Sequence, residues 1–217
     1  MPRRPPADVE PAPVPKSRTL VTLRKAAATC QACPLAAAAT QTVFGEGPQD
    51  ARVVLVGEQA GDHEDREGRP FVGQAGLVLD RALEAVGIER QSTYITNVVK
   101  HFKWVAKGKR RLHQKPNARE IGACLPWLDA EIDLIKPEVI VALGSTAALA
   151  LVGKDVQVTR DRGKLMDTPR GVQALVTMHP SAVLRMPTDE YRELALRDLV
   201  ADLMIVAELL RGKARRR

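Results

Sequence analysis

One histidine of the sequence stands within a run of positive charges. Residues 109–115 read KRRLHQK, and in this run His113 follows Lys109, Arg110 and Arg111. Neighbouring cations disfavour a further positive charge, so we expect a neutral imidazole whose nitrogen lone pair can act as a nucleophile. The run also fits a solvated basic loop or a patch that binds a polyanion. The rest of the sequence must decide between these interpretations.

Polar residues and glycines follow four short apolar segments of the chain. They stand in GEQAGDHED (57–65), at Asn97, in GST (144–146) and in HPSA (179–182). If the segments are parallel strands, the loops at their carboxyl ends meet at one edge of the sheet, where ligands bind. The candidates named by this position are Glu58, Gln59, Asp62, Asp65, Asn97, His179 and Ser181.

Phe71 lies in the continuation of the first of these loops, between Pro70 and Val72 and with glycines nearby. A buried core aromatic is the simpler interpretation of this residue. The alternative is a ring on which a nucleic-acid base stacks.

Three cysteines form a second chemical pattern. Cys30 and Cys33 make a CxxC pair before the first strand, and Cys124 lies in a helical segment. A thioredoxin-type redox pair is expected after a strand, so that interpretation is disfavoured. His101 is a reasonable fourth soft ligand, and Cys3His sets bind zinc or iron–sulfur clusters. Three unrelated buried thiols are the alternative.

The elements that position these residues alternate along the chain. Segments 51–57, 93–99, 137–144 and 173–180 are rich in apolar residues and read as buried strands. Helical patterns cover about 75–85, 118–135 and 146–152, and an amphipathic stretch covers 191–210. Strands that alternate with helices predict an α/β fold of three layers, α/β/α, with a central four-stranded parallel sheet.

Composition sets the domain organisation and the class of partner. The chain has 217 residues, with 33 Lys and Arg against 26 Asp and Glu, a formal charge of +7. This favours a polyanionic partner. We expect a disordered Pro-rich tail at 1–16, one domain at 17–211 and a basic tail at 212–217. Without an apolar membrane span or a signal peptide, we expect a cytoplasmic protein that binds no membrane. Nothing in the sequence suggests a repeated interface, so we expect a monomer.

The combination of motifs resembles the iron–sulfur uracil-DNA glycosylases of family four. These motifs are GEQAGDHEDREGRPFVGQAG, TNVVKH, the CxxC pair and HPSAVL. KRRLHQK is similar to the basic loop of the UdgX branch, whose members become covalently attached to uracil-containing DNA. The resemblance spans roughly residues 28–210. It implies the uracil-DNA glycosylase fold, uracil-containing DNA as the partner, with single strands favoured, and a 4Fe-4S cluster, with zinc as the alternative.

The resemblance also implies roles for single residues. The cluster ligands are Cys30, Cys33, His101 and Cys124, although the commoner family-four pattern has Cys in place of His101. Phe71 stacks on a flipped uracil, Asn97 reads its edge, and Gln59 and Asp62 complete the pocket. His179 donates to uracil O2, where negative charge develops. Ser181 holds a flanking phosphate, and Lys109, Arg110 and Arg111 bind the DNA backbone.

His113 gains a specific function from this resemblance. After uracil leaves, its ring nitrogen attacks the sugar C1′ in place of water and forms a covalent protein–DNA bond, with Glu58 orienting the imidazole. The first alternative is a conventional multiple-turnover glycosylase, in which water attacks. The second is a non-enzymatic, metal-containing nucleic-acid sensor, which predicts DNA binding without uracil release.

Overall fold

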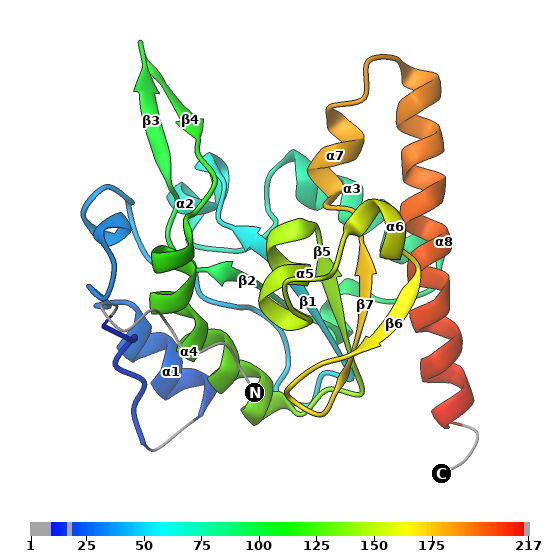
Figure 1. The fold of residues 1–217 in the computed structure, drawn as a ribbon, viewed down its shortest axis with the longest axis horizontal. Coiled ribbons are helices and arrows are strands. Elements are labelled where there is room, and N and C mark those ends of the chain that lie inside the picture. The colour runs from blue at the N-terminus through cyan, green and yellow to red at the C-terminus, as the bar shows by residue number, and fades with distance from the viewer. Residues whose placement is uncertain (1–9, 17–18, 215–217) are drawn as a thin grey trace.

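A computed structural model describes residues 10–16 and 19–214 and is built around a five-stranded sheet (Figure 1). The strand order is β2-β1-β5-β7-β6, and the bounds are β1 Val53–Gln59, β2 Tyr94–Val99, β5 Val139–Leu143, β6 Lys164–Asp167 and β7 Gln173–Thr177. Strands β1, β2, β5 and β7 are parallel, which confirms the four predicted strands. Strand β6 adds an antiparallel edge that the sequence analysis missed.

Helices cover both faces of the sheet. Successive side chains of a strand point to opposite faces, and in the buried strands the side chains on both faces are apolar. Val54 and Val56 of β1 pack in one apolar cluster with helices α1, α4 and α5. Val53 and Leu55 pack in another with α3, α7 and α8. The bounds are α1 Leu20–Ala27, α3 Gln74–Ala85, α4 Ala118–Ile135, α5 Ser145–Leu151, α7 Pro180–Leu184 and α8 Asp189–Ala214. The predicted three-layer α/β/α fold is therefore confirmed.

A two-stranded hairpin stands away from this body, at the upper left of Figure 1. Its strands are β3 Trp104–Lys107 and β4 Arg110–His113, joined by a tight turn at Gly108 with φ of 59°. The sequence predicts only a loop for this basic segment. Its strands are short and mostly exposed, so they lack the apolar pattern that identifies a buried strand.

Short helices and the ends of the chain complete the fold. The short helices are α2 Asp62–Glu67, α6 Val158–Asp161, η1 Pro34–Ala37 and η2 Arg90–Ser92. Of the predicted N-terminal tail, residues 1–9 lie outside the described part, and 10–16 run as irregular chain with Ala12 N donating to Ala123 O at 3.0 Å. Helix α8 extends to Ala214, into the predicted basic tail. Within the described ranges, no helix combines the length and apolar character needed to cross a membrane.

Candidate active site

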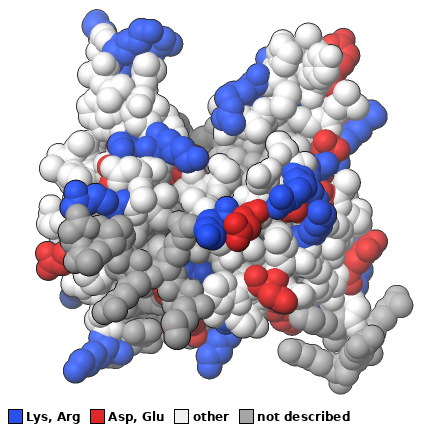
Figure 2. Space-filling model, in the orientation of Figure 1, with Lys and Arg blue, Asp and Glu red and all other residues white. Residues whose placement is uncertain are grey.

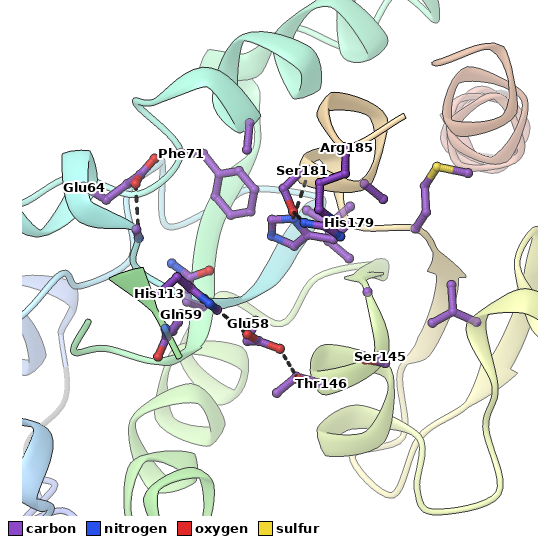
Figure 3. A pocket seen from close by; sticks show the side chains of 18 of the residues that line it. Glu58, Gln59, Glu64, Phe71, His113, Ser145, Thr146, His179, Ser181 and Arg185 are labelled. Atoms are coloured by element: carbon purple, nitrogen blue, oxygen red, sulfur yellow. Dashed lines mark hydrogen bonds and ion pairs between the residues drawn. The ribbon is translucent and has the colours of Figure 1, made fainter. Parts of the chain in front are cut away.

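A cavity of about 590 Å³ opens at the carboxyl edge of the sheet (Figure 3). Strand β2 and the loops after β1, β5 and β7 contribute to its wall, as expected for a parallel sheet. The predicted site residues that line it are Glu58, Gln59, Phe71, Asn97, His113, His179 and Ser181. The sequence analysis therefore identified residues that are far apart in the chain and that the fold brings to one cavity.

Asn97 on β2 presents an unpaired acceptor in this wall. The residue is 2% exposed, and its side-chain oxygen Oδ1 has no hydrogen-bond partner within the described part of the chain. A buried acceptor without a partner costs about 1–3 kcal/mol, so such an atom points to a ligand that donates to it. Gly57 of β1 leaves room for this oxygen, because a Cβ there would lie 2.3 Å from Asn97 Oδ1 and 2.6 Å from Phe71 Cζ.

Phe71 forms an aromatic wall beside Asn97. Its ring is stacked on the His179 ring, with 5.6 Å between the centroids and 29° between the planes. The Phe71 backbone has a φ of 54°, in the left-handed region that a bulky residue rarely adopts. Such a conformation costs about 1–3 kcal/mol and persists only where the surroundings impose it.

His179 is a neutral hydrogen-bond donor in the cavity wall. Its Nδ1 accepts from Ser181 N at 3.1 Å and lies 2.8 Å from Ser181 Oγ, which accepts from Arg185 Nη1 at 2.8 Å (Figure 3). Because Nδ1 accepts a backbone N–H, the neutral ring carries its proton on Nε2. Burial lowers the pKa of His179 to about 4, and nearby Arg185 and His113 act in the same direction. The ring therefore donates through Nε2 without carrying a charge at pH 7.

His113 reaches the same cavity from the end of the hairpin. Its Nε2 lies 3.4 Å from Glu58 Oε1, and its side chain is 50% exposed. The other Glu58 oxygen, Oε2, accepts a short hydrogen bond from Thr146 Oγ1 at the start of α5 (Figure 3). Thr146 thus fixes the carboxylate, so that Oε1 faces the imidazole. The fold therefore places His113 beside Glu58, the partner that the resemblance implies for it, although its sequence neighbours are cations.

Gln59 holds the base of the hairpin in place. Its side-chain Nε2 donates to Gln114 O at 3.0 Å and to Lys103 O at 3.3 Å, and its Oε1 accepts from Lys103 N at 3.2 Å. This amide is therefore occupied by backbone groups on both sides of the hairpin. Gln59 lines the cavity as predicted, while its polar atoms position the segment that carries His113.

Arg111 anchors the hairpin to α2, whereas the sequence predicts a contact with DNA phosphate for it. Its guanidinium forms ion pairs with Asp62 and, at 2.6 Å, with Asp65, and lies over the rings of Phe102 and Trp104. The side chain is only 14% exposed, because two carboxylates and two rings surround it. Asp62, predicted to bind uracil, is not among the residues that line the cavity and pairs instead with this arginine.

Positive charge is found on both sides of the hollow over the site. Lys107, Lys109 and Arg110 are exposed at the end of the hairpin. Figure 2 shows this basic end and, across the hollow, further basic groups over α7, where Arg185 lines the cavity. An anionic strand that crosses the hollow would therefore meet cations on each side.

Thr146, Arg185 and Glu64 are among the lining residues that the sequence does not identify as candidates. Thr146 and Arg185 act through side chains that only the fold brings together, so no local pattern identifies them. Glu64 lines the cavity, and its carboxylate accepts from Gly61 N and Gly73 N, at 3.1 and 2.8 Å. A capping pattern, with Glu64 three residues after Gly61, is a signal that could have identified it.

The predicted metal ligands surround a second, small cavity. Cys30, Cys33, His101 and Cys124 all line it and are all buried. Cys30 Sγ accepts from Trp127 Nε1 at 3.4 Å, and Cys124 Sγ accepts from Lys100 N at 3.3 Å. Within residues 10–16 and 19–214, however, no three metal-binding side chains lie close enough to form a ligand group. The donor set around this cavity therefore fits a soft metal centre by the chemistry of its residues.

A hydrogen bond selects the tautomer of His101. Thr42 Oγ1 donates to Ala27 O at 2.9 Å and lies 2.9 Å from His101 Nε2. Because its one proton goes to Ala27, the Thr42 hydroxyl must accept from Nε2. The lone pair available to a metal is then on Nδ1 of His101.

Comparison with known proteins agrees with this fold. Residues 44–200 match the family model described as the uracil DNA glycosylase superfamily. A type-4 uracil-DNA glycosylase of Thermotoga maritima is 43% identical over 171 residues, which cover 78% of this chain and 85% of that protein. A type-4 uracil-DNA glycosylase of Pyrobaculum aerophilum is 41% identical over 165 residues, or 73% of this chain and 81% of that protein. The chain therefore belongs to the uracil DNA glycosylase superfamily.

Proposed function

We propose that this protein cleaves the bond between uracil and deoxyribose in DNA. The observation that supports this most strongly is the buried, unpaired Oδ1 of Asn97 beside an aromatic wall, since uracil is a planar base with an N3–H donor. The names of the type-4 relatives support the same activity. A base in a duplex or stacked strand must be flipped out before it enters such a cavity.

The proposed chemistry assigns one task to each side chain. Phe71 stacks on the flipped base, and Asn97 accepts from uracil N3–H while its amide donates to O4. As the glycosidic bond breaks, negative charge develops on the base, and the neutral Nε2–H of His179 stabilises it at O2. Lys109 and Arg110 at the end of the hairpin attract the DNA backbone.

The test is uracil release from a single-stranded oligonucleotide that contains one deoxyuridine. Released uracil is measured by chromatography, and the abasic product by cleavage in alkali. We expect release from this strand and none from matched strands that carry cytosine or thymine. A protein that binds all three strands equally and releases no base would instead be the non-enzymatic sensor, and would refute the proposal.

The substitution Gly57→Ala is expected to disturb base binding indirectly, by displacing Asn97 and Phe71. The new methyl group of Gly57→Ala would collide with Asn97 Oδ1 and the Phe71 ring, and overpacking of this kind costs about 1–3 kcal/mol. We expect uracil release to slow by about tenfold. The matched control is Gly212→Ala, where an added Cβ meets no atom within 4 Å. Equal rates for the two variants would contradict the packing argument.

His179 is expected to make stability depend on pH. Its pKa in the folded protein is about 4, against an ordinary value of 6.5, so the unfolded chain binds a proton first as pH falls. The contribution of neutral His179 is complete above about pH 6.5 and is lost between there and about pH 4. Urea unfolding at pH 7 and pH 5 should show a larger loss for the wild type than for His179→Gln. Parallel losses would show that this ring titrates normally.

The position of His113 favours a second candidate function. In a conventional glycosylase, water attacks C1′ and the enzyme turns over, and the type-4 names of the relatives support that course. His113, however, lines the same cavity, with Nε2 3.4 Å from a carboxylate that Thr146 holds. We propose as the second candidate that a ring nitrogen of His113 attacks C1′, and that Glu58 stabilises the positive charge that the ring then carries.

A denaturing gel separates the two candidates, because only a covalent complex survives denaturation. The second candidate predicts a stoichiometric shifted band with the deoxyuridine strand, and no such band for His113→Ala. Gln114→Ala, in which the neighbouring exposed side chain is removed, serves as the matched control and should retain the band. Free abasic product in excess of one equivalent per protein would establish the conventional course.

We also propose that Cys30, Cys33, His101 and Cys124 hold a 4Fe-4S cluster. The soft donors around one buried cavity, and the N–H groups directed at two of the sulfurs, support this assignment. When bound, such a cluster would tie the N-terminal segment to α4 and to the loop after β2. Iron, sulfide and zinc analysis with a visible spectrum tests the assignment. Equimolar zinc without sulfide would identify the alternative, and protein free of both metals would refute it.

A further inference from the structure

The strained backbone of Phe71 is held by an arginine outside the cavity. Arg90 in η2 donates from Nη2 to Pro70 O and to Phe71 O, both at 3.1 Å. Its Nη1 donates to Asp80 Oδ1 of α3 at 2.6 Å. Arg90 is not among the residues that line the cavity, so it meets neither base nor sugar there. Its contacts with the Phe71 segment are to backbone carbonyls.

Helix α3 also confines this carbonyl, through close packing of its own backbone. A Cβ at Gly76, in the first turn of α3, would lie 1.9 Å from Phe71 O. Phe71 O therefore packs closely against the backbone at Gly76 and also accepts from the guanidinium of Arg90. Arg90 is itself fixed by Asp80 on α3, so one helix supplies both constraints.

These constraints determine where the aromatic ring lies. The backbone angles of a residue set the direction of its Cα–Cβ bond and therefore the side toward which its ring projects. At a φ of 54°, Phe71 projects into the wall beside His179 and Gly57. If the carbonyl were released, the backbone could relax to an ordinary conformation, and the ring would leave this position.

We propose that Arg90, held by Asp80, is a positioning residue that presents the Phe71 ring to the flipped base. This inference rests on the proposed function, because the ring matters only if a base binds against it. The alternative is a purely structural role, in which Arg90 joins η2 to the rest of the domain. The two roles differ in whether the effect of Arg90 depends on the Phe71 ring.

A double-mutant cycle measures that dependence. Uracil release is followed with protein in excess over the deoxyuridine strand, so that one turnover reports both the maximal rate and the half-saturating protein concentration. The variants are Arg90→Ala, Phe71→Ala and the double variant. In the wild-type background, we expect Arg90→Ala to slow uracil release by about tenfold, in line with the loss of one stacking contact. In the Phe71→Ala background, we expect the same change to have almost no effect on uracil release.

Two further variants make the result specific. Arg69→Ala removes a neighbouring arginine whose side chain pairs with Glu46 and is 62% exposed, and it should behave as the wild type. Asp80→Asn weakens the ion pair that holds Arg90. Because Asp80 is 41% exposed, this variant replaces Arg90→Ala in the test if Arg90→Ala does not fold. We expect a smaller loss for Asp80→Asn, again only when Phe71 is present.

The outcomes separate this inference from the proposed function. The positioning role would be overturned if Arg90→Ala, or Asp80→Asn in its place, slowed uracil release equally with and without the Phe71 ring. It would also be overturned if neither variant slowed uracil release. A wild-type protein that releases no uracil would refute the proposed function before the cycle begins.

Discussion

Replacing Asn97 by alanine should lower the rate of uracil release at least about a hundredfold, as loss of a preorganised polar contact in an active site typically does. Asn97 is buried on β2, and its Oδ1 finds no protein partner in the described structure. The alanine variant removes the acceptor that we assign to uracil N3–H and the donor that we assign to O4. The fold should be little affected, because the lost oxygen makes no hydrogen bond within the described residues.

Asn117→Ala is the matched control for this prediction. Asn117 caps α4, and its side chain accepts from Glu120 N at 3.0 Å. Loss of the cap should cost about 1 kcal/mol of stability while uracil release stays near the wild-type rate. Single-turnover release and urea unfolding of both variants provide the comparison. If Asn97→Ala releases uracil within a few-fold of the wild type, Asn97 does not read the base.

Removing Glu131 should have the largest effect on stability, about 3–5 kcal/mol. Glu131 of α4 forms an ion pair with Lys100 at 2.5 Å, and the two side chains are 0% and 1% exposed. The carboxylate also accepts from Tyr94 Oη at 2.9 Å and from Gly45 N at 3.1 Å. In Glu131→Ala the Lys100 ammonium stays buried without its counter-ion, and three further donors, on Gly45, Tyr94 and Thr96, lose their acceptor.

Urea unfolding measures this loss, with Asp189→Ala as the control. Asp189 pairs with Arg192 at 2.7 Å on the surface of α8, and its side chain is 91% exposed. An exposed pair contributes about 1 kcal/mol or less, so the control should unfold close to the wild type. If the two variants lost similar amounts of stability, the buried network would not stabilise the packing of β2 against α4.

The sheet and its edge could be predicted from the sequence because burial leaves a local signal. Strands β1, β2, β5 and β7 are almost wholly buried, so their apolar runs identify them without reference to any partner. Parallel pairing then places Glu58, Asn97 and His179 at one edge. Strand β6 and the β3–β4 hairpin could not be predicted, because strands of four mostly exposed or half-buried residues lack such apolar runs.

The roles of several side chains could not be predicted, because their partners are remote in sequence. Arg111 reads as a cation for DNA, yet Asp62 and Asp65 lie close enough in the fold to hold it. Nothing local to Phe71 indicates a positive φ, which depends on Arg90 and Gly76. Chemistry that depends on residue type could be predicted from the sequence, and geometry that depends on distant contacts could not.

The most direct test of the account is the position of uracil in a crystal structure of the protein with uracil-containing single-stranded DNA. We expect uracil N3 to lie within hydrogen-bond distance of Asn97 Oδ1, the uracil ring to stack on Phe71, and O2 to face Nε2 of His179. Uracil bound outside this cavity, or inside it with Asn97 Oδ1 still unpaired, would contradict the account.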